Sequence, residues 1–173
     1  MKAKAGLAGV VIAAASLPFV MGAQAQSGGP ECFGRPATMI FGDGGQTIDG
    51  TGGDDVIIAG GGADFIDGRA GDDRICAGRG WDVAQGGTKQ DKLKGGPGRD
   101  FLAGRSTFDS DHCCLNDGGD ILRGNSGRDD FNGGSGNDDI NGGSDRDITF
   151  GGPGDDTCVR VEDKRDHCPK PGS

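Results

Sequence analysis

The chain has 173 residues, of which 38 are glycine, and its 27 acidic side chains outnumber the 18 basic ones. With one Trp and no Tyr it contains few large core residues, so the composition allows at most one modest domain. The acidic surplus repels nucleic acid and anionic lipid and attracts cations, and no basic patch with interleaved aromatic residues occurs, which excludes DNA or RNA binding.

The N-terminal segment differs from the rest of the chain. Lys2 and Lys4 precede an apolar run at residues 7–20, and the small-x-small sequence Ala-Gln-Ala follows at 23–25. This pattern predicts a secretory signal peptide over residues 1–25. The run is shorter than the roughly 20 residues that a membrane-spanning helix needs, so we expect no membrane span. The protein is therefore predicted to be secreted and extracellular, with residues 26–40 as an N-terminal cap segment.

A nine-residue period begins at Phe41 and ends at Val159. Two clear copies are GGSGNDDIN at 133–141 and GGPGDDTCV at 151–159, and the same phase divides the range into thirteen units. The sixth residue is Asp in every unit except the first, which has Gln46. A disordered Gly/Asp-rich segment would not hold its phase over so many units, so we expect an ordered repeat structure.

Each unit is predicted to form a six-residue turn and a three-residue strand. Glycines at the first, second and fourth positions permit φ > 0, so the turn can curl tightly. Side chains alternate along the strand, which leaves only the eighth position facing the interior. We therefore expect an all-β fold with a thin core, in which two parallel sheets face each other and two units make one coil of eighteen residues. The eighth-position residues that form this core are Ile48, Ile57, Ile66, Ile75, Leu93, Leu102, Leu122, Phe131 and Ile140.

The pattern G-G-x-G-x-D-x-U-x resembles the RTX, or hemolysin-type, calcium-binding nonapeptide repeat, and the resemblance covers residues 41–159. It implies a parallel β-roll in which calcium ions lie between stacked turns, held by sixth-position aspartates and by carbonyls of the glycine region. Calcium suits such sites because it accepts carbonyl and carboxylate oxygens alike, whereas Mg²⁺ demands a smaller octahedral shell. The predicted ligands are Asp55, Asp64, Asp73, Asp82, Asp91, Asp100, Asp120, Asp129, Asp138, Asp147 and Asp156.

The segment 104–114 departs from the period because it is two residues too long. We expect it to form an irregular loop that bulges from the roll, so Asp109 is left out of the predicted ligands. Lys89, Thr107 and Asp145 replace the fourth glycine of their units, and we expect these units to bind calcium weakly or not at all.

Six cysteines in a secreted chain indicate disulfides, with fifteen possible complete pairings. We favour Cys158 with Cys168, a bond that would fasten the C-terminal tail, residues 160–173, to the last unit. Asp-His-Cys occurs at both 111–113 and 166–168. His112 and His167 could therefore contribute to a zinc or copper site, but we favour disulfides with exposed histidines. The cysteines are Cys32, Cys76, Cys113, Cys114, Cys158 and Cys168.

These features predict a monomeric, non-enzymatic calcium-binding protein that folds when it binds the ions and acts as a structural or interaction module. One alternative is a calcium-rigidified surface adhesin or matrix component, with Trp81 as a candidate contact for a protein or carbohydrate partner. A small secreted hydrolase is less favoured. Only His112 and His167 could act as bases near neutral pH, and no G-x-S-x-G motif occurs.

Overall fold

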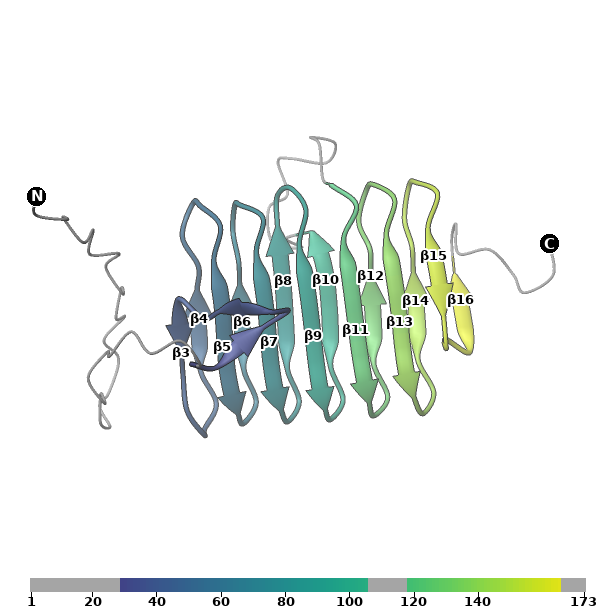
Figure 1. Cartoon of the computed structure of the whole chain (residues 1–173). Helices are drawn as coiled ribbons and strands as arrows, with labels where there is room; N and C mark the ends of the chain where they lie inside the picture. Colours follow the sequence, from purple (N-terminus) through teal and green to yellow (C-terminus); the bar gives the residue numbers. More distant parts are fainter. Residues whose placement is uncertain (1–28, 106–117, 166–173) are drawn as a thin grey trace, which may run out of the picture.

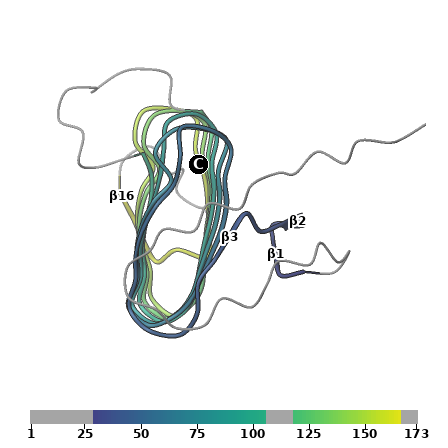
Figure 2. The same ribbon diagram turned by 90° about the vertical axis from the view of Figure 1, so that its left-hand side faces the viewer.

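The structure, a computed structural model, describes residues 29–105 and 118–165. The chain winds into a parallel β-roll whose two seven-stranded sheets face each other (Figure 1). Viewed along its axis, the roll is a flattened oval of stacked coils (Figure 2). The all-β, parallel roll expected from the sequence is therefore confirmed. Within the described residues, no helix has the length and apolar character that crossing a bilayer requires.

Successive strands alternate between the two sheets. The first sheet contains β3 (Met39–Ile40), β5 (Val56–Gly61), β7 (Arg74–Arg79), β9 (Lys92–Pro97), β11 (Ile121–Ser126), β13 (Asp139–Ser144) and β15 (Thr157–Val159). The second sheet contains β4 (Thr47–Asp49), β6 (Phe65–Asp67), β8 (Val83–Gly87), β10 (Phe101–Arg105), β12 (Asp130–Asn132), β14 (Ile148–Phe150) and β16 (Asp163–Arg165).

The thin core is built as the period predicts. Ile57 pairs with Ile75 and Ile48 with Ile66, so residues one coil apart differ by eighteen in number. Every eighth-position residue predicted to face inward is at most 2% exposed. The smaller residues Ala84 and Thr149, which occupy the same position in their units, are also fully buried.

The described residues on either side of 106–117 keep the regular pairing of the coils. Leu93 pairs with Leu122, and the backbone N–H of Asp91 donates to the Asp120 carboxylate. These partners are 29 residues apart in the sequence, whereas equivalent partners such as Asp73 and Asp91 are 18 apart. The eleven extra residues therefore leave the alternation between sheets unchanged. Strand β10 continues to Arg105, so the first two residues of the predicted loop, 104 and 105, belong to a strand. Most of the unit at 104 lies outside the described residues, and the number of units stays a prediction.

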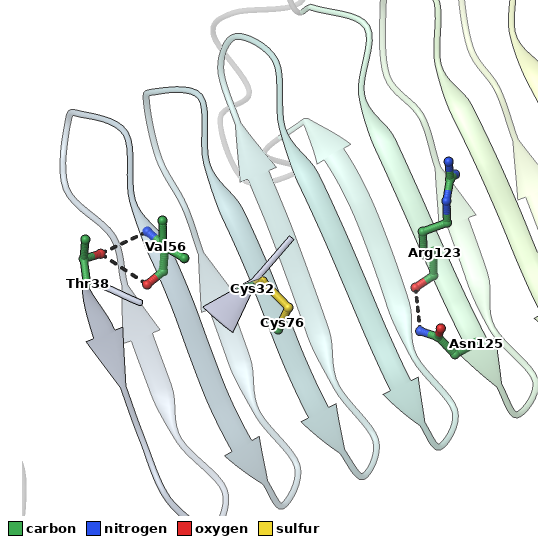
Figure 3. The surroundings of a disulfide bond; sticks show 6 residues. All are labelled: Cys32, Thr38, Val56, Cys76, Arg123 and Asn125. Carbon is green, nitrogen blue, oxygen red and sulfur yellow. Dashed lines mark hydrogen bonds between the residues drawn. A yellow bond between two sulfur atoms is a disulfide. The ribbon is translucent and has the colours of Figure 1, made fainter. Parts of the chain in front are cut away.

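The sheets extend beyond both predicted ends of the roll. Strand β3 precedes residue 41 and pairs with β5, while β16 follows residue 159 and pairs with β14. Thr38 supports the first coil, because its Oγ1 accepts the Val56 N–H at 2.9 Å and donates to the Val56 carbonyl at 3.2 Å (Figure 3). The N-terminal segment thus contributes a strand of its own to the roll.

A disulfide fastens the N-terminal hairpin to the first sheet. The hairpin consists of β1 (Glu31–Cys32) and β2 (Arg35–Pro36), and Cys32 is bonded to Cys76 in β7 (Figure 3). The sequence had left this pairing open. Cys158 is also disulfide-bonded, but its predicted partner, Cys168, lies outside the described residues, as do Cys113 and Cys114.

Glycines in the turns serve two different purposes. Gly80, at a fourth position, has φ of 135°, which side chains rarely adopt. Gly68, at a first position, has no such φ. A Cβ on Gly68 would instead press on Asp73 Oδ2 and on the Gly86 carbonyl oxygen. The prediction that first-position glycines serve to supply positive φ is therefore wrong at Gly68, where the close approach of oxygen atoms is what excludes a side chain.

Replacement of Gly80 should test how tightly the turns stack. In Gly80→Ala the new Cβ would overlap the Gly62 carbonyl oxygen, a backbone atom that cannot move aside. We expect the free energy of unfolding in saturating calcium to fall by about 3 kcal/mol, from strain and overpacking together. Urea unfolding measures the loss. Gly52→Ala is the matched control, because a Cβ on Gly52 meets nothing within 4 Å, and an equal loss in both variants would contradict tight stacking at Gly80.

Candidate metal centre

The sixth-position aspartates lie where each turn passes into a strand, as Asp73 does immediately before β7. Strands of the two sheets run in opposite directions, so these aspartates form two files on opposite edges of the roll (Figure 1). All eleven predicted ligands are buried, with at most 5% of each exposed. The first file contains Asp55, Asp73, Asp91, Asp120, Asp138 and Asp156. The second contains Asp64, Asp82, Asp100, Asp129 and Asp147.

Within each file, one carboxylate oxygen ties neighbouring coils together. Asp73 Oδ1 accepts the backbone N–H of Asp55 at 2.8 Å, and Asp100 Oδ1 accepts that of Asp82 at 3.0 Å. Asp120 Oδ1 accepts the Asp91 N–H at 2.8 Å, so this ladder of bonds continues past the insertion. The bonds fix the orientation of each carboxylate and hold its second oxygen, Oδ2, in a defined place.

That second oxygen is left without a hydrogen-bond partner in much of the ladder. Buried carboxylate oxygens of this kind are costly unless something else compensates them. The Oδ2 atoms without a hydrogen-bond partner include those of Asp64, Asp73, Asp82, Asp100, Asp129 and Asp147.

Backbone carbonyls border the same spaces. A Cβ built on Gly68 would contact both Asp73 Oδ2 and the Gly86 carbonyl oxygen, so both atoms face one small gap between coils. Within the two described ranges, no three side chains of His, Cys, Asp or Glu gather as a metal-binding group. The donors that do lie together are carboxylate and carbonyl oxygens, the set that a hard cation such as calcium prefers.

Burial makes these carboxylates hard to ionise. It raises the pKa of Asp73 and Asp100 to about 7, although the backbone N–H bonds lower them and neighbouring negative charges raise them further. Burial likewise raises the pKa of Asp129 and Asp147 to about 6. The files therefore resist full ionisation near neutral pH unless positive charge is supplied.

Two residues at the start of the files differ from the rest. Asp55 Oδ2 accepts the Thr51 N–H at 2.6 Å and the Thr51 hydroxyl at 2.9 Å, so protein donors already satisfy it. The backbone N–H of Gln46 donates to Asp64 Oδ1 at 2.7 Å. The Gln46 side chain is an amide, however, so the second file has no carboxylate at this first position. These contacts distinguish Asp55 from the predicted ligands whose Oδ2 has no hydrogen-bond partner.

The units that lack a fourth glycine keep the shape of the turn. Lys89 and Asp145 adopt φ of 84° and 80°, the conformation that glycine supplies elsewhere. Asp147, the ladder residue after Asp145, still accepts the Asp129 N–H at 2.9 Å. Weaker calcium binding by these units stays a prediction. Asp109, Thr107, His112 and His167 lie outside the described residues.

Sequence reasoning missed one acidic residue of the second file. Glu162 Oε2 accepts the Asp147 N–H at 2.8 Å, fifteen residues away. The nine-residue period ends before Glu162, so no motif marks it. The signal available in the sequence was the acidic pair Glu162 and Asp163 shortly after the last unit.

Comparison with known families supplies a match over most of the roll. The family model described as the RTX calcium-binding nonapeptide repeat matches the chain in four copies, at residues 42–75, 77–110, 116–149 and 123–158. Searches among characterised proteins and among solved structures find no match.

The raised pKa values predict opposite effects of pH with and without calcium. Between pH 3.8, the ordinary pKa of Asp, and about 7, the metal-free roll binds more protons at Asp73 and Asp100 than the unfolded chain does. Stability without calcium should therefore fall as pH rises through this range. Calcium affinity should rise over the same range, because protons compete for the carboxylates.

Circular dichroism in calcium-free buffer at about pH 5.5 and pH 8, paired with calcium titrations at each pH, measures both effects. A metal-free β signal that is stronger at pH 8 than at pH 5.5 would contradict the statement that burial raises the pKa of these carboxylates.

Proposed function

The chain belongs to the family of RTX calcium-binding nonapeptide repeat proteins, and from this premise we propose that it is a secreted, non-enzymatic structural or interaction module that folds when calcium binds. The observation that best supports this proposal is the pair of buried aspartate files, in which Oδ2 atoms such as that of Asp100 have no hydrogen-bond partner. Calcium binding is what the repeat family implies. The aspartates and the carbonyls beside them fit that ion.

Folding on binding follows from the balance between the core and the charges. Bound calcium supplies positive charge and takes about six to eight oxygen ligands at roughly 2.3–2.6 Å. Asp73 Oδ2 and the Gly86 carbonyl oxygen are examples of the atoms that would hold it. Without that charge the stacked carboxylates repel one another, and a core of one apolar residue per unit offers little to oppose them. The Oδ1 bonds fix the carboxylates only once the coils have stacked, so stacking and binding support each other.

We propose no catalytic role for the acidic residues. Each ladder aspartate is buried and, apart from Asp55, accepts a backbone N–H through Oδ1. These contacts suit a fixed structural role better than proton transfer to a substrate.

Secretion is proposed on two grounds. The segment 1–25, which the sequence predicts to be a signal peptide, lies outside the described residues. The Cys32–Cys76 disulfide is typical of an oxidising compartment such as the cell exterior.

A calcium titration followed by far-UV circular dichroism tests the proposal. We expect β signal to appear on addition of calcium but not of magnesium, both before and after reduction of the disulfides. In Asp100→Asn the amide oxygen can still accept the Asp82 N–H, but one negative charge is lost, so the calcium midpoint should rise several-fold. Asp49→Asn removes an exposed charge that pairs with Arg69 and should leave the midpoint unchanged. An identical compact β signal in chelator and in millimolar calcium would reject the proposal.

A surface adhesin is the second candidate, because an apolar hollow lies on the second sheet. Its volume is about 340 Å³, and Phe65, Val83 and Trp81 contribute to its lining. Trp81 is 63% exposed, which is unusual because tryptophan side chains are highly buried on average.

If the roll is an adhesin, Trp81→Ala should weaken retention on cell envelope or extracellular matrix at least tenfold in calcium, and chelator should abolish retention. Ile40→Ala, which truncates an exposed apolar residue outside the hollow, is the control. Equal retention of both variants would exclude the hollow as the adhesive surface.

A further inference from the structure

The roll ends in a turn that differs from all the repeat turns. Three residues, 160–162, separate Val159 from Asp163, whereas six residues separate their pairing partners Asn141 and Ile148 one coil earlier. Strand β16 nevertheless pairs in register with β14, Ile148 opposite Asp163. The family match stops at residue 158, so this turn lies outside the recognised repeat.

Glu162 occupies the place of the next aspartate in the second file. Its Oε2 accepts the Asp147 N–H at 2.8 Å, just as Asp147 Oδ1 accepts the Asp129 N–H at 2.9 Å. The two bonds are equivalent steps of one ladder, although the first spans fifteen residues and the second eighteen. Glutamate is one methylene longer than aspartate, which allows it to reach the ladder from a turn that is three residues shorter.

The carbonyl beside this position is also reproduced. A Cβ on Gly124 would meet Asp129 Oδ2 and the Gly142 carbonyl oxygen. A Cβ on Gly142 would meet Asp147 Oδ2 and the Arg160 carbonyl oxygen. Arg160 has φ of 52°, a conformation rare for a residue with a side chain. The chain therefore presents the Arg160 carbonyl where the repeat presents that of a glycine.

Asp147 supplies the unsatisfied group. Its side chain is fully buried, and its Oδ2 has no hydrogen-bond partner. Glu162 is exposed, and its carboxylate is hydrogen-bonded to the backbone N–H of Asp147. Three kinds of oxygen thus lie together: the orphaned Asp147 Oδ2, the Arg160 carbonyl and the Glu162 carboxylate.

We propose that Asp147, Arg160 and Glu162 form a terminal calcium site, which the repeat motif does not encode and which closes the last coil of the roll. The proposal rests on the proposed function, because it assigns one more site to a protein that binds calcium in its repeats. The site fastens β16 to β14 and ends the second file with a charged ligand, whereas the head of that file has the uncharged Gln46.

The substitution Glu162→Gln distinguishes two roles of Glu162, that of a calcium ligand and that of a residue that only accepts a hydrogen bond. The amide oxygen can still accept the Asp147 N–H, but the negative charge is lost. Glu31→Gln is the matched control, since Glu31 is the only other glutamate of the chain and is exposed in the N-terminal hairpin. Native mass spectrometry at saturating calcium counts the bound ions. We expect Glu162→Gln to hold one ion fewer than the wild type and Glu31→Gln to hold the same number.

Hydrogen exchange in calcium provides a second measurement at the same place. In Glu162→Gln the amides of β16 should exchange at least tenfold faster than in the wild type, while those of β5 stay unchanged and show that the roll is folded. An unchanged ion count with unchanged β16 exchange overturns the terminal site and leaves the proposed function intact. A wild type that binds no calcium overturns the proposed function itself.

Discussion

The structure depends on one constraint: carboxylates are buried in line, one per coil, along each edge of a molecule with almost no core. Asp73 and Asp100 show the result, since burial raises the pKa of each to about 7. A conventional domain buries enough apolar surface to tolerate a few such groups, but one isoleucine or leucine per nine residues does not provide that surplus. Under the proposed function, cations at the edges of the roll supply stabilisation that the apolar contacts at its centre do not.

The same aspartates also help to set the spacing of the coils. Each of them except Asp55 accepts a backbone N–H of the preceding coil, so these bonds depend on the same stacking distance as the sheet bonds do. A shift of one coil against the next would break both sets of bonds at once. This coupling explains why the ladder continues from Asp91 to Asp120 although eleven extra residues lie between them.

The sequence predicted the parts of the fold that repeat. The phase of the aspartates and of residues such as Ile57 and Leu93 was sufficient to predict two facing sheets, the eighteen-residue coil and the buried positions. It could not predict features that occur once. Glu162 lies fifteen residues from its ladder partner and therefore outside any nine-residue register. The Cys32–Cys76 pairing joins segments 44 residues apart, and nothing in the spacing of six cysteines selects it. The prediction that Gly68 supplies a positive φ is wrong. The sequence shows that Gly68 has no side chain, but it does not show which neighbouring atoms would clash with one.

The extra residues between β10 and β11 have a consequence for how such rolls diversify. Strand pairing is regular up to Arg105, Gly118 again bonds to the preceding coil, and the ladder resumes at Asp120 with the next strand in its usual register. Residues added at this corner of the solenoid therefore change neither the pitch of the coils nor the register of their strands. Evolution or an engineer can vary what a corner displays while the scaffold beneath it keeps the same architecture.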